Sequence, residues 1–108
     1  MAKTNENLHL VRIDSVQVKG TSGLFGRATL MVYGILPSPA YELFTIETTI
    51  QKDEIVLKPL AKHDPEKIVI QITVPFQEKI KVKGLKRKMT YQIKVQGQES
   101  TVVEKFKL

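Results

Sequence analysis

The chain lacks cysteine and tryptophan, and it contains no long apolar run. Without cysteine there is no disulfide framework and no thiolate metal site, so packing alone must hold the 108 residues together. No stretch approaches the ~18 apolar residues that a membrane-spanning helix needs, and the beginning of the chain lacks the charged-then-apolar order of a signal peptide. We therefore expect no membrane-spanning segment. We expect a cytoplasmic protein if the chain is full length, or an extracytoplasmic one if a leader was removed.

Helical periodicity is also missing. No window repeats apolar residues at positions i, i+3, i+4 and i+7 over three turns. The chain instead carries ten isoleucines, eleven valines and nine threonines, whose β-branched side chains fit a pleated strand. The composition predicts an all-β fold with less than about a tenth of its residues in helices, against roughly a third in an average globular protein.

Apolar alternation and turn residues divide the chain into about eight strands, at a spacing typical of a β-sandwich. The predicted strands cover residues 8–18, 27–35, 41–51, 54–58, 67–74 and 100–106, with two more around Ile80 and Ile93. No repeat, linker or low-complexity tract interrupts them. We expect a disordered N-terminal tail over residues 1–7 and a single β-sandwich domain over residues 8–108.

Local features refine two of these strands. The first strand changes the parity of its apolar residues twice, between Leu10 and Val11 and again before Val16. Because a one-residue shift exchanges the two faces of a strand, we expect a bulge there or a crossing from one sheet to the other. Pro59 and Pro75 are expected to end strands, since proline cannot donate a hydrogen bond to a ladder.

The predicted core rests on strict alternation. Between positions 67 and 74 the side chains expected to point inward are Ile68, Ile70, Ile72 and Val74. The residues expected to be almost fully buried are Ile70, Ile72, Ile93 and Val95. In the long strand over residues 41–51, the side chains expected to share one face are Phe44, Ile46, Thr48 and Ile50.

One motif resembles a known feature of β-sandwiches. The spacing Leu85-x-x-x-x-x-Tyr91-x-Ile93-x-Val95 resembles the tyrosine corner of immunoglobulin-like and fibronectin-like domains. The resemblance implies an immunoglobulin-like antiparallel β-sandwich of about seven to eight strands, with the Tyr91 hydroxyl bonded to nearby backbone. Ile93 would occupy the place of a disulfide cysteine, and Tyr41 or Phe44 the place of the core tryptophan.

A second resemblance covers roughly residues 34–97. The segments Gly34-Ile35-Leu36-Pro37 and Pro75-Phe76-Gln77 are similar to those of small, mostly uncharacterised sandwich domains in bacterial secreted or lipid-anchored proteins. In those domains an acid stands at position 77 and an asparagine at position 96, where this chain has glutamine. The resemblance implies a fold and carries no activity.

Catalytic signatures are missing as well. His9 and His63 are the two histidines, and neither lies in a nucleophile-elbow or similar context. His63 has acidic neighbours but no third strong ligand at metal-site spacing. We expect no enzyme, no metal site and no cofactor. A hydrolase would need a cleft that brings His9 or His63 onto a serine or an aspartate.

A glycine-punctuated loop is predicted between the first two strands, over residues 19–27. Gly20, Gly23 and Gly26 are spaced as in some phosphate-binding loops, but those loops precede a helix, and this one joins two strands. Phe25 at the tip has two open interpretations. It packs onto the end of the sandwich, or it is exposed as an anchor for a partner.

The charge is concentrated in one segment. Residues 78–96 carry seven cationic residues and one acid, a local net charge of +6 that equals the net charge of the whole chain. The candidate polyanion-binding residues are Lys79, Lys81, Lys83, Lys86, Arg87 and Lys88. Such a patch attracts nucleic acid, acidic glycans or anionic lipid. Lysines that alternate with apolar residues are also typical of a solvated face or a guarded edge strand.

These observations predict a non-catalytic interaction or structural module. Its expected partner is an unknown protein. Weak, salt-sensitive binding to polyanions is a second expected interaction. The alternative is a small five-stranded β-barrel that binds nucleic acid or another polyanion through the basic patch, which we define as Lys79, Lys81, Lys83, Lys86, Arg87 and Lys88.

Overall fold

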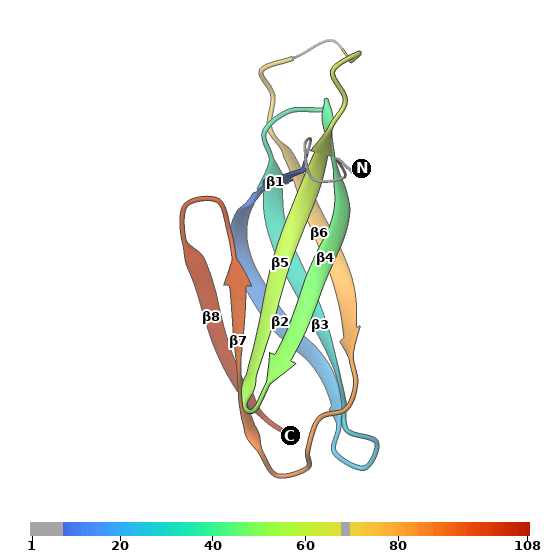
Figure 1. Ribbon diagram of the computed structural model, residues 1–108, viewed down its shortest axis with the longest axis vertical. Helices are drawn as coiled ribbons and strands as arrows, with labels where there is room; N and C mark the ends of the chain where they lie inside the picture. The colour runs from blue at the N-terminus through green and yellow to red at the C-terminus, as the bar shows by residue number, and fades with distance from the viewer. Residues whose placement is uncertain (1–7, 68–69) are drawn as a thin grey trace, which may run out of the picture.

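The computed structural model describes residues 8–67 and 70–108, and these residues form eight strands and no helix. The strands are β1 (Leu8–Leu10), β2 (Arg12–Ser22), β3 (Arg27–Leu36), β4 (Tyr41–Gln51), β5 (Glu54–His63), β6 (Val74–Val82), β7 (Thr90–Gln96) and β8 (Thr101–Lys107). They build two layers (Figure 1), which confirms the predicted all-β sandwich. The part of the chain described here accordingly offers no helix long and apolar enough to span a bilayer. The predicted tail over residues 1–7 lies outside the described residues.

The two sheets differ in size. In the smaller sheet β3 lies between β2 and β6, and in the larger one β5 has β4 on one side and both β1 and β7 on the other, with β8 beyond β7. All pairings are antiparallel except that of β5 with β7, which is parallel where antiparallel pairing was expected. The eight strands form two separate sheets, and this arrangement also differs from the five-stranded barrel of the alternative interpretation.

The predicted change of sheet at the N-terminus is confirmed. Leu10 pairs with Leu60 in the larger sheet, whereas Arg12 pairs with Ile35 in the smaller one. Val11 is the hinge between them and is 1% exposed. The second parity change is a register shift in β2 between positions 13 and 15.

The core lies between the inward faces of β3, β5 and β7, where every second side chain is buried. Leu30 and Val32 of β3, Ile55 and Leu57 of β5, and Ile93 and Val95 of β7 have no exposed surface. The predicted burial of Ile93 and Val95 is therefore confirmed, because strict alternation places both toward the opposite sheet.

The strand predicted over residues 67–74 is wrong. Ile70 and Ile72 are 48% and 59% exposed, and β6 begins only at Val74; Ile68 lies outside the described residues. Val74 pairs with Leu36, the last residue of β3. Beyond this pair the neighbouring chain turns away, so residues 70–73 have no strand to pair with.

Both proline predictions are also wrong, since β5 continues through Pro59 and β6 includes Pro75. Pro59 lies between the segment of β5 that pairs with β7 and the segment that pairs with β1, so no ladder partner faces it on that side. Pro75 lies in an edge strand, which needs hydrogen bonds on one side only.

Strand β4 contains a bulge that alternation alone did not reveal. Its register shifts between Leu43 and Thr45, so Phe44 leaves the expected inner face and is 56% exposed, while Ile46 packs against the core. Of the two alternatives for the place of the core tryptophan, Tyr41 packs against the core and Phe44 does not.

Candidate functional site

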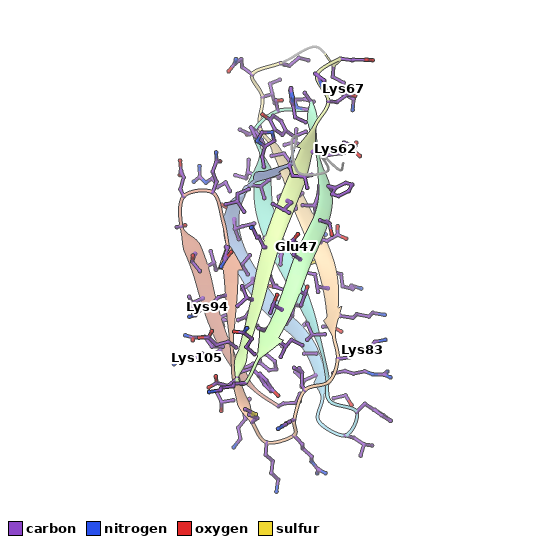
Figure 2. The ribbon with its side chains drawn as sticks, viewed as in Figure 1. Glu47, Lys62, Lys67, Lys83, Lys94 and Lys105 are labelled. Carbon is purple, nitrogen blue, oxygen red and sulfur yellow. The ribbon has the colours of Figure 1, made fainter. Side chains whose placement is uncertain are left out.

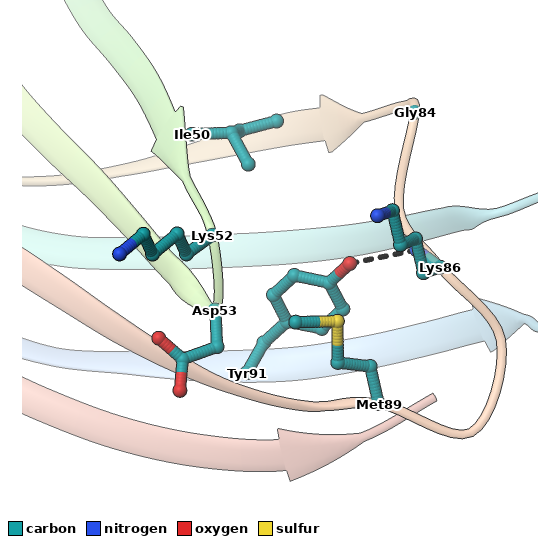
Figure 3. Close-up of a pocket in the computed structure, with 7 residues that line it drawn as sticks. All are labelled: Ile50, Lys52, Asp53, Gly84, Lys86, Met89 and Tyr91. Carbon is teal, nitrogen blue, oxygen red and sulfur yellow. Dashed lines mark hydrogen bonds between the residues drawn. The ribbon is translucent and has the colours of Figure 1, made fainter.

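A tyrosine corner holds the loop that joins β6 to β7. Tyr91 is 2% exposed, and its hydroxyl oxygen accepts a hydrogen bond of 2.7 Å from the backbone N–H of Lys86 (Figure 3). Leu85, the residue before, is buried at this end of the core. The predicted corner is thereby confirmed. It fixes the backbone of Lys86 while the side chains of Lys86, Arg87 and Lys88 remain exposed.

The same loop is attached to the hairpin turn between β2 and β3, which spans residues 23–26. Leu85 donates its N–H to the carbonyl oxygen of Gly26 over 3.0 Å. Gly26 has a φ of 63°, and a Cβ there would lie 2.3 Å from the carbonyl oxygen of Leu85. Only glycine permits so close an approach in this conformation. The two loops are therefore held side by side at one end of the sandwich, at the bottom of Figure 1.

Lys79 and Lys81 lie on the outer face of the smaller sheet, beside Met31 and Thr29 of β3, while Val82 points into the core. This confirms the alternation predicted for the strand. Lys83 follows directly after β6, near the lower end of the molecule (Figure 2). The rest of the basic patch continues around that end.

The basic patch is not neutralised within the described part of the chain. The ion pairs formed by residues 8–67 and 70–108 are Arg12 with Asp14, at 3.9 Å, and Lys94 with Glu54, at 2.9 Å. Neither involves a residue of the basic patch, and all six of its side chains are exposed. Their charge is therefore available to a partner.

The tip of the β2–β3 hairpin is apolar. Leu24 is 76% exposed and Phe25 is 66% exposed, and the guanidinium carbon of Arg27 lies 5.6 Å from the centroid of the Phe25 ring. Packing of Phe25 onto the sandwich end is therefore wrong. Leu85 and Gly26 already close that end of the core, so the ring extends beyond it; its role as a partner anchor stays a prediction.

The hairpin itself is shorter than the predicted loop over residues 19–27. Strand β2 continues to Ser22, and Gly20 lies within it. The turn is closed by a 3.4 Å hydrogen bond from the N–H of Gly26 to the carbonyl oxygen of Gly23. Only four residues therefore stand outside the ladder, and the two at the tip are Leu24 and Phe25.

A pocket of about 580 Å³ opens beside the tyrosine corner (Figure 3). Its lining residues are Ile50, Lys52, Asp53, Gly84, Lys86, Met89 and Tyr91. Lys52 and Lys86 lie on opposite sides of the Tyr91 ring, and Asp53 supplies the one carboxylate of the lining. The pocket thus brings Lys52 of the β4–β5 turn into the same lining as Lys86 of the basic patch, together with the Asp53 carboxylate.

Sequence reasoning missed Lys52 because nothing near it in the chain signals a site. Its position depends on the parallel pairing of β5 with β7, which brings the β4–β5 turn beside β7. The backbone N–H of Gln92 donates to the carbonyl oxygen of Asp53 over 2.8 Å and fixes that turn.

The open side of the sandwich carries a second hollow, a groove of about 390 Å³ between the edge strands β4 and β6. Phe44 lies in it, and the Lys62 ammonium nitrogen is 5.7 Å from the centroid of its ring. Lys79 and Lys81 contribute to the opposite wall, together with Glu78. The basic patch therefore borders this groove as well as the lower end.

The two histidines, remote in sequence, both contact Tyr41 at the other end of the molecule. The Tyr41 ring lies between them, edge-on to His9 with ring centroids 5.6 Å apart and tilted against His63 with centroids 4.8 Å apart. Within the described residues neither imidazole hydrogen-bonds to a serine or aspartate side chain. The expectation that the protein is not an enzyme stays a prediction.

Comparison with protein-family models, with curated proteins and with solved structures finds no match to this chain.

Proposed function

We propose that the protein is a non-catalytic interaction module that binds a polyanionic partner through the basic patch. The observation that carries the proposal is that six exposed cationic side chains gather along β6 and around one end of the sandwich, and that the described residues provide no acidic partner for them. A surface of this kind gains affinity by releasing counterions from a polyanion.

The binding is expected to be weak and unselective. Arg87 is the one arginine of the basic patch, and arginine rather than lysine makes the bidentate contacts that distinguish phosphate geometries. The cross-strand neighbours of Lys79 and Lys81 are Met31 and Thr29, which offer no ring for base stacking. The attraction therefore comes mainly from charge, and salt screens it within about 8 Å at physiological ionic strength.

We also infer an immunoglobulin-like architecture for the sandwich. The tyrosine corner before the penultimate strand supports this inference, because Tyr91 bonds to the turn that precedes it, as in those domains. The parallel pairing of β5 with β7 is a departure from their two antiparallel sheets. The architecture is compatible with a binding module and implies no activity.

A titration of heparin and of duplex DNA at low and physiological salt tests the proposed function. If about three phosphates are contacted, raising salt from ~50 to ~200 mM should weaken binding by a few tens of fold. The Lys86/Arg87/Lys88→Ala variant should lose most of the low-salt binding. A matched control, Lys58/Lys62/Lys67→Ala, removes the same charge elsewhere on the molecule and should bind nearly as well as the unmodified protein. No binding at low salt, or equal losses in both variants, would overturn the proposal.

A further inference from the structure

We propose that the polyanion is the surface of an anionic lipid bilayer, and that Leu24 and Phe25 insert into it while the neighbouring cations contact the headgroups. This inference rests on the proposed function and names the class of partner. It starts from the β2–β3 hairpin, whose two tip residues are the most exposed of the large hydrophobic side chains in the described residues.

The tip is unusual for a hairpin turn. Turn positions favour glycine, asparagine, aspartate and serine, whereas Leu24 and Phe25 stand here between Gly23 and Gly26. Their exposure, 76% and 66%, leaves both side chains in water. Two adjacent large apolar side chains at a loop tip gain free energy only from a partner that removes them from water.

Cations surround this tip on both loops. Arg27 lies over the Phe25 ring. A Cβ at Gly23 would be 3.5 Å from the Cγ atom of Arg87 and 3.5 Å from the backbone oxygen of Leu108, so Arg87 lies beside the turn. The segments 22–29 and 83–90 contain no acidic residue. The tip therefore has an apolar centre and a positive rim, which complements the apolar interior and negative surface of an anionic bilayer.

The arrangement is also suited to a flat surface. The hydrogen bond between Leu85 and Gly26 holds both loops at the same end of an elongated molecule of 49 × 33 × 21 Å. A planar partner at that end contacts the hairpin tip and residues 86–88 together (Figure 1). Nucleic acid could stack a base on Phe25, but Leu24 has no planar face for stacking. The pair of side chains therefore favours a bilayer.

Vesicle sedimentation provides the test. The probes are vesicles of phosphatidylcholine alone and vesicles in which about a third of the lipid is phosphatidylserine. The unmodified protein should bind the second and not the first, because one or two inserted side chains need the electrostatic contribution to hold the protein at the surface. Leu24→Ser/Phe25→Ser should weaken vesicle binding at least about tenfold and leave heparin binding unchanged. Ile72→Ser, at an apolar position in another loop that is 59% exposed, is the control and should change neither.

The outcomes separate the two proposals. Heparin binding without vesicle binding, or vesicle binding that survives Leu24→Ser/Phe25→Ser, overturns the bilayer inference and leaves the proposed function standing. If the unmodified protein binds neither heparin nor vesicles at low salt, the proposed function is wrong. Equal binding to the two kinds of vesicle would mean that the cations do not contribute to binding through the anionic headgroups, which contradicts their role in the inference.

Insertion itself has a direct readout because the chain contains no tryptophan. Phe25→Trp introduces a single indole at the tip, and Ile72→Trp introduces one elsewhere for comparison. Phosphatidylserine-containing vesicles should shift the Phe25→Trp emission to shorter wavelength and leave Ile72→Trp unchanged. Sedimentation with vesicles but no shift at position 25 would mean that the tip stays in water, and the inference would be wrong.

Discussion

At the scale of single residues, the Tyr91 side chain joins the core to the candidate surface. Its ring packs in the core and stacks on Phe106, with centroids 5.8 Å apart, while its hydroxyl oxygen accepts the N–H of Lys86. One side chain thus belongs to the apolar interior at its base and orders the basic loop at its tip. Because the ring is buried in the core, the same packing that stabilises the fold also holds the loop in its conformation.

Removal of the hydroxyl group isolates this contribution. In Tyr91→Phe the Lys86 N–H loses its acceptor, and the free energy of unfolding should fall by about 1–2 kcal/mol. Tyr33→Phe is the matched control, because Tyr33 is only partly buried and its hydroxyl forms no hydrogen bond within the described residues. Denaturant melts of both variants give the comparison. Equal stability of Tyr91→Phe and the unmodified protein would contradict the corner.

Two isoleucines with the same sequence signal have opposite environments. Ile93 has no exposed surface, whereas Ile72 is 59% exposed. Ile93→Ala should cost about 2–5 kcal/mol through lost burial and a cavity, and Ile72→Ala should stay within ~0.5 kcal/mol. Urea melts measure both. Comparable losses would show that Ile72 is packed after all.

Alternation could not separate these two residues, because it reports which side chains share a face and not whether a strand has a neighbour. β7 is paired on both sides, and every second side chain along it is buried. The segment before Val74 alternates equally well, but β3 ends at Leu36 and leaves it unpaired. The tyrosine corner was predictable because it depends on residues only five positions apart in the chain.

At the scale of elements, the functional candidate is a junction of two loops about sixty residues apart in sequence. The β2–β3 turn and the β6–β7 loop meet where the backbone N–H of Leu85 donates a hydrogen bond to the carbonyl oxygen of Gly26. Sequence reasoning named both loops as candidate surfaces but had no signal that they touch. Their contact follows from the position of β6 beside β3, a long-range pairing that local patterns do not encode.

A methyl group at the junction should separate the loops. Gly26→Ala places a Cβ 2.3 Å from the Leu85 carbonyl oxygen on a backbone with positive φ, so it should lower the free energy of unfolding by more than ~1 kcal/mol. Gly20→Ala is the control, because a Cβ there meets nothing within 4 Å. Thermal melts measure stability, and vesicle sedimentation of the folded variant reports the surface, which should bind more weakly. Unchanged stability of Gly26→Ala would contradict the close approach.

The sheet change at Val11 shows which element-level features a sequence does contain. A shift of one residue in apolar parity marked both the crossing from β1 to β2 and the bulge in β2. The continuation of β5 through Pro59 carried no such mark. It depends on an exchange of partners, from β7 to β1, at that residue.

At the scale of the whole molecule, the sandwich is an elongated body with one end that differs from the rest. Along its length, acids and bases are mixed, and Glu47 and Lys62 both lie on the larger sheet (Figure 2). At the lower end the loops over residues 23–26 and 84–88 contain cations and apolar residues without an acid. The net charge of +6 is thus presented to a partner mainly from β6 and that end.

The central claim is that this end, and no other surface, contacts a polyanionic membrane. Amide hydrogen exchange with and without phosphatidylserine-containing vesicles locates the contact on the intact chain. The account predicts slower exchange in residues 23–27 and 83–90. Exchange should stay unchanged in β4, in residues 74–78 of β6 and in the loop that contains Ile72. Protection along β4, or around His9 and His63, with none in residues 23–27, would contradict it.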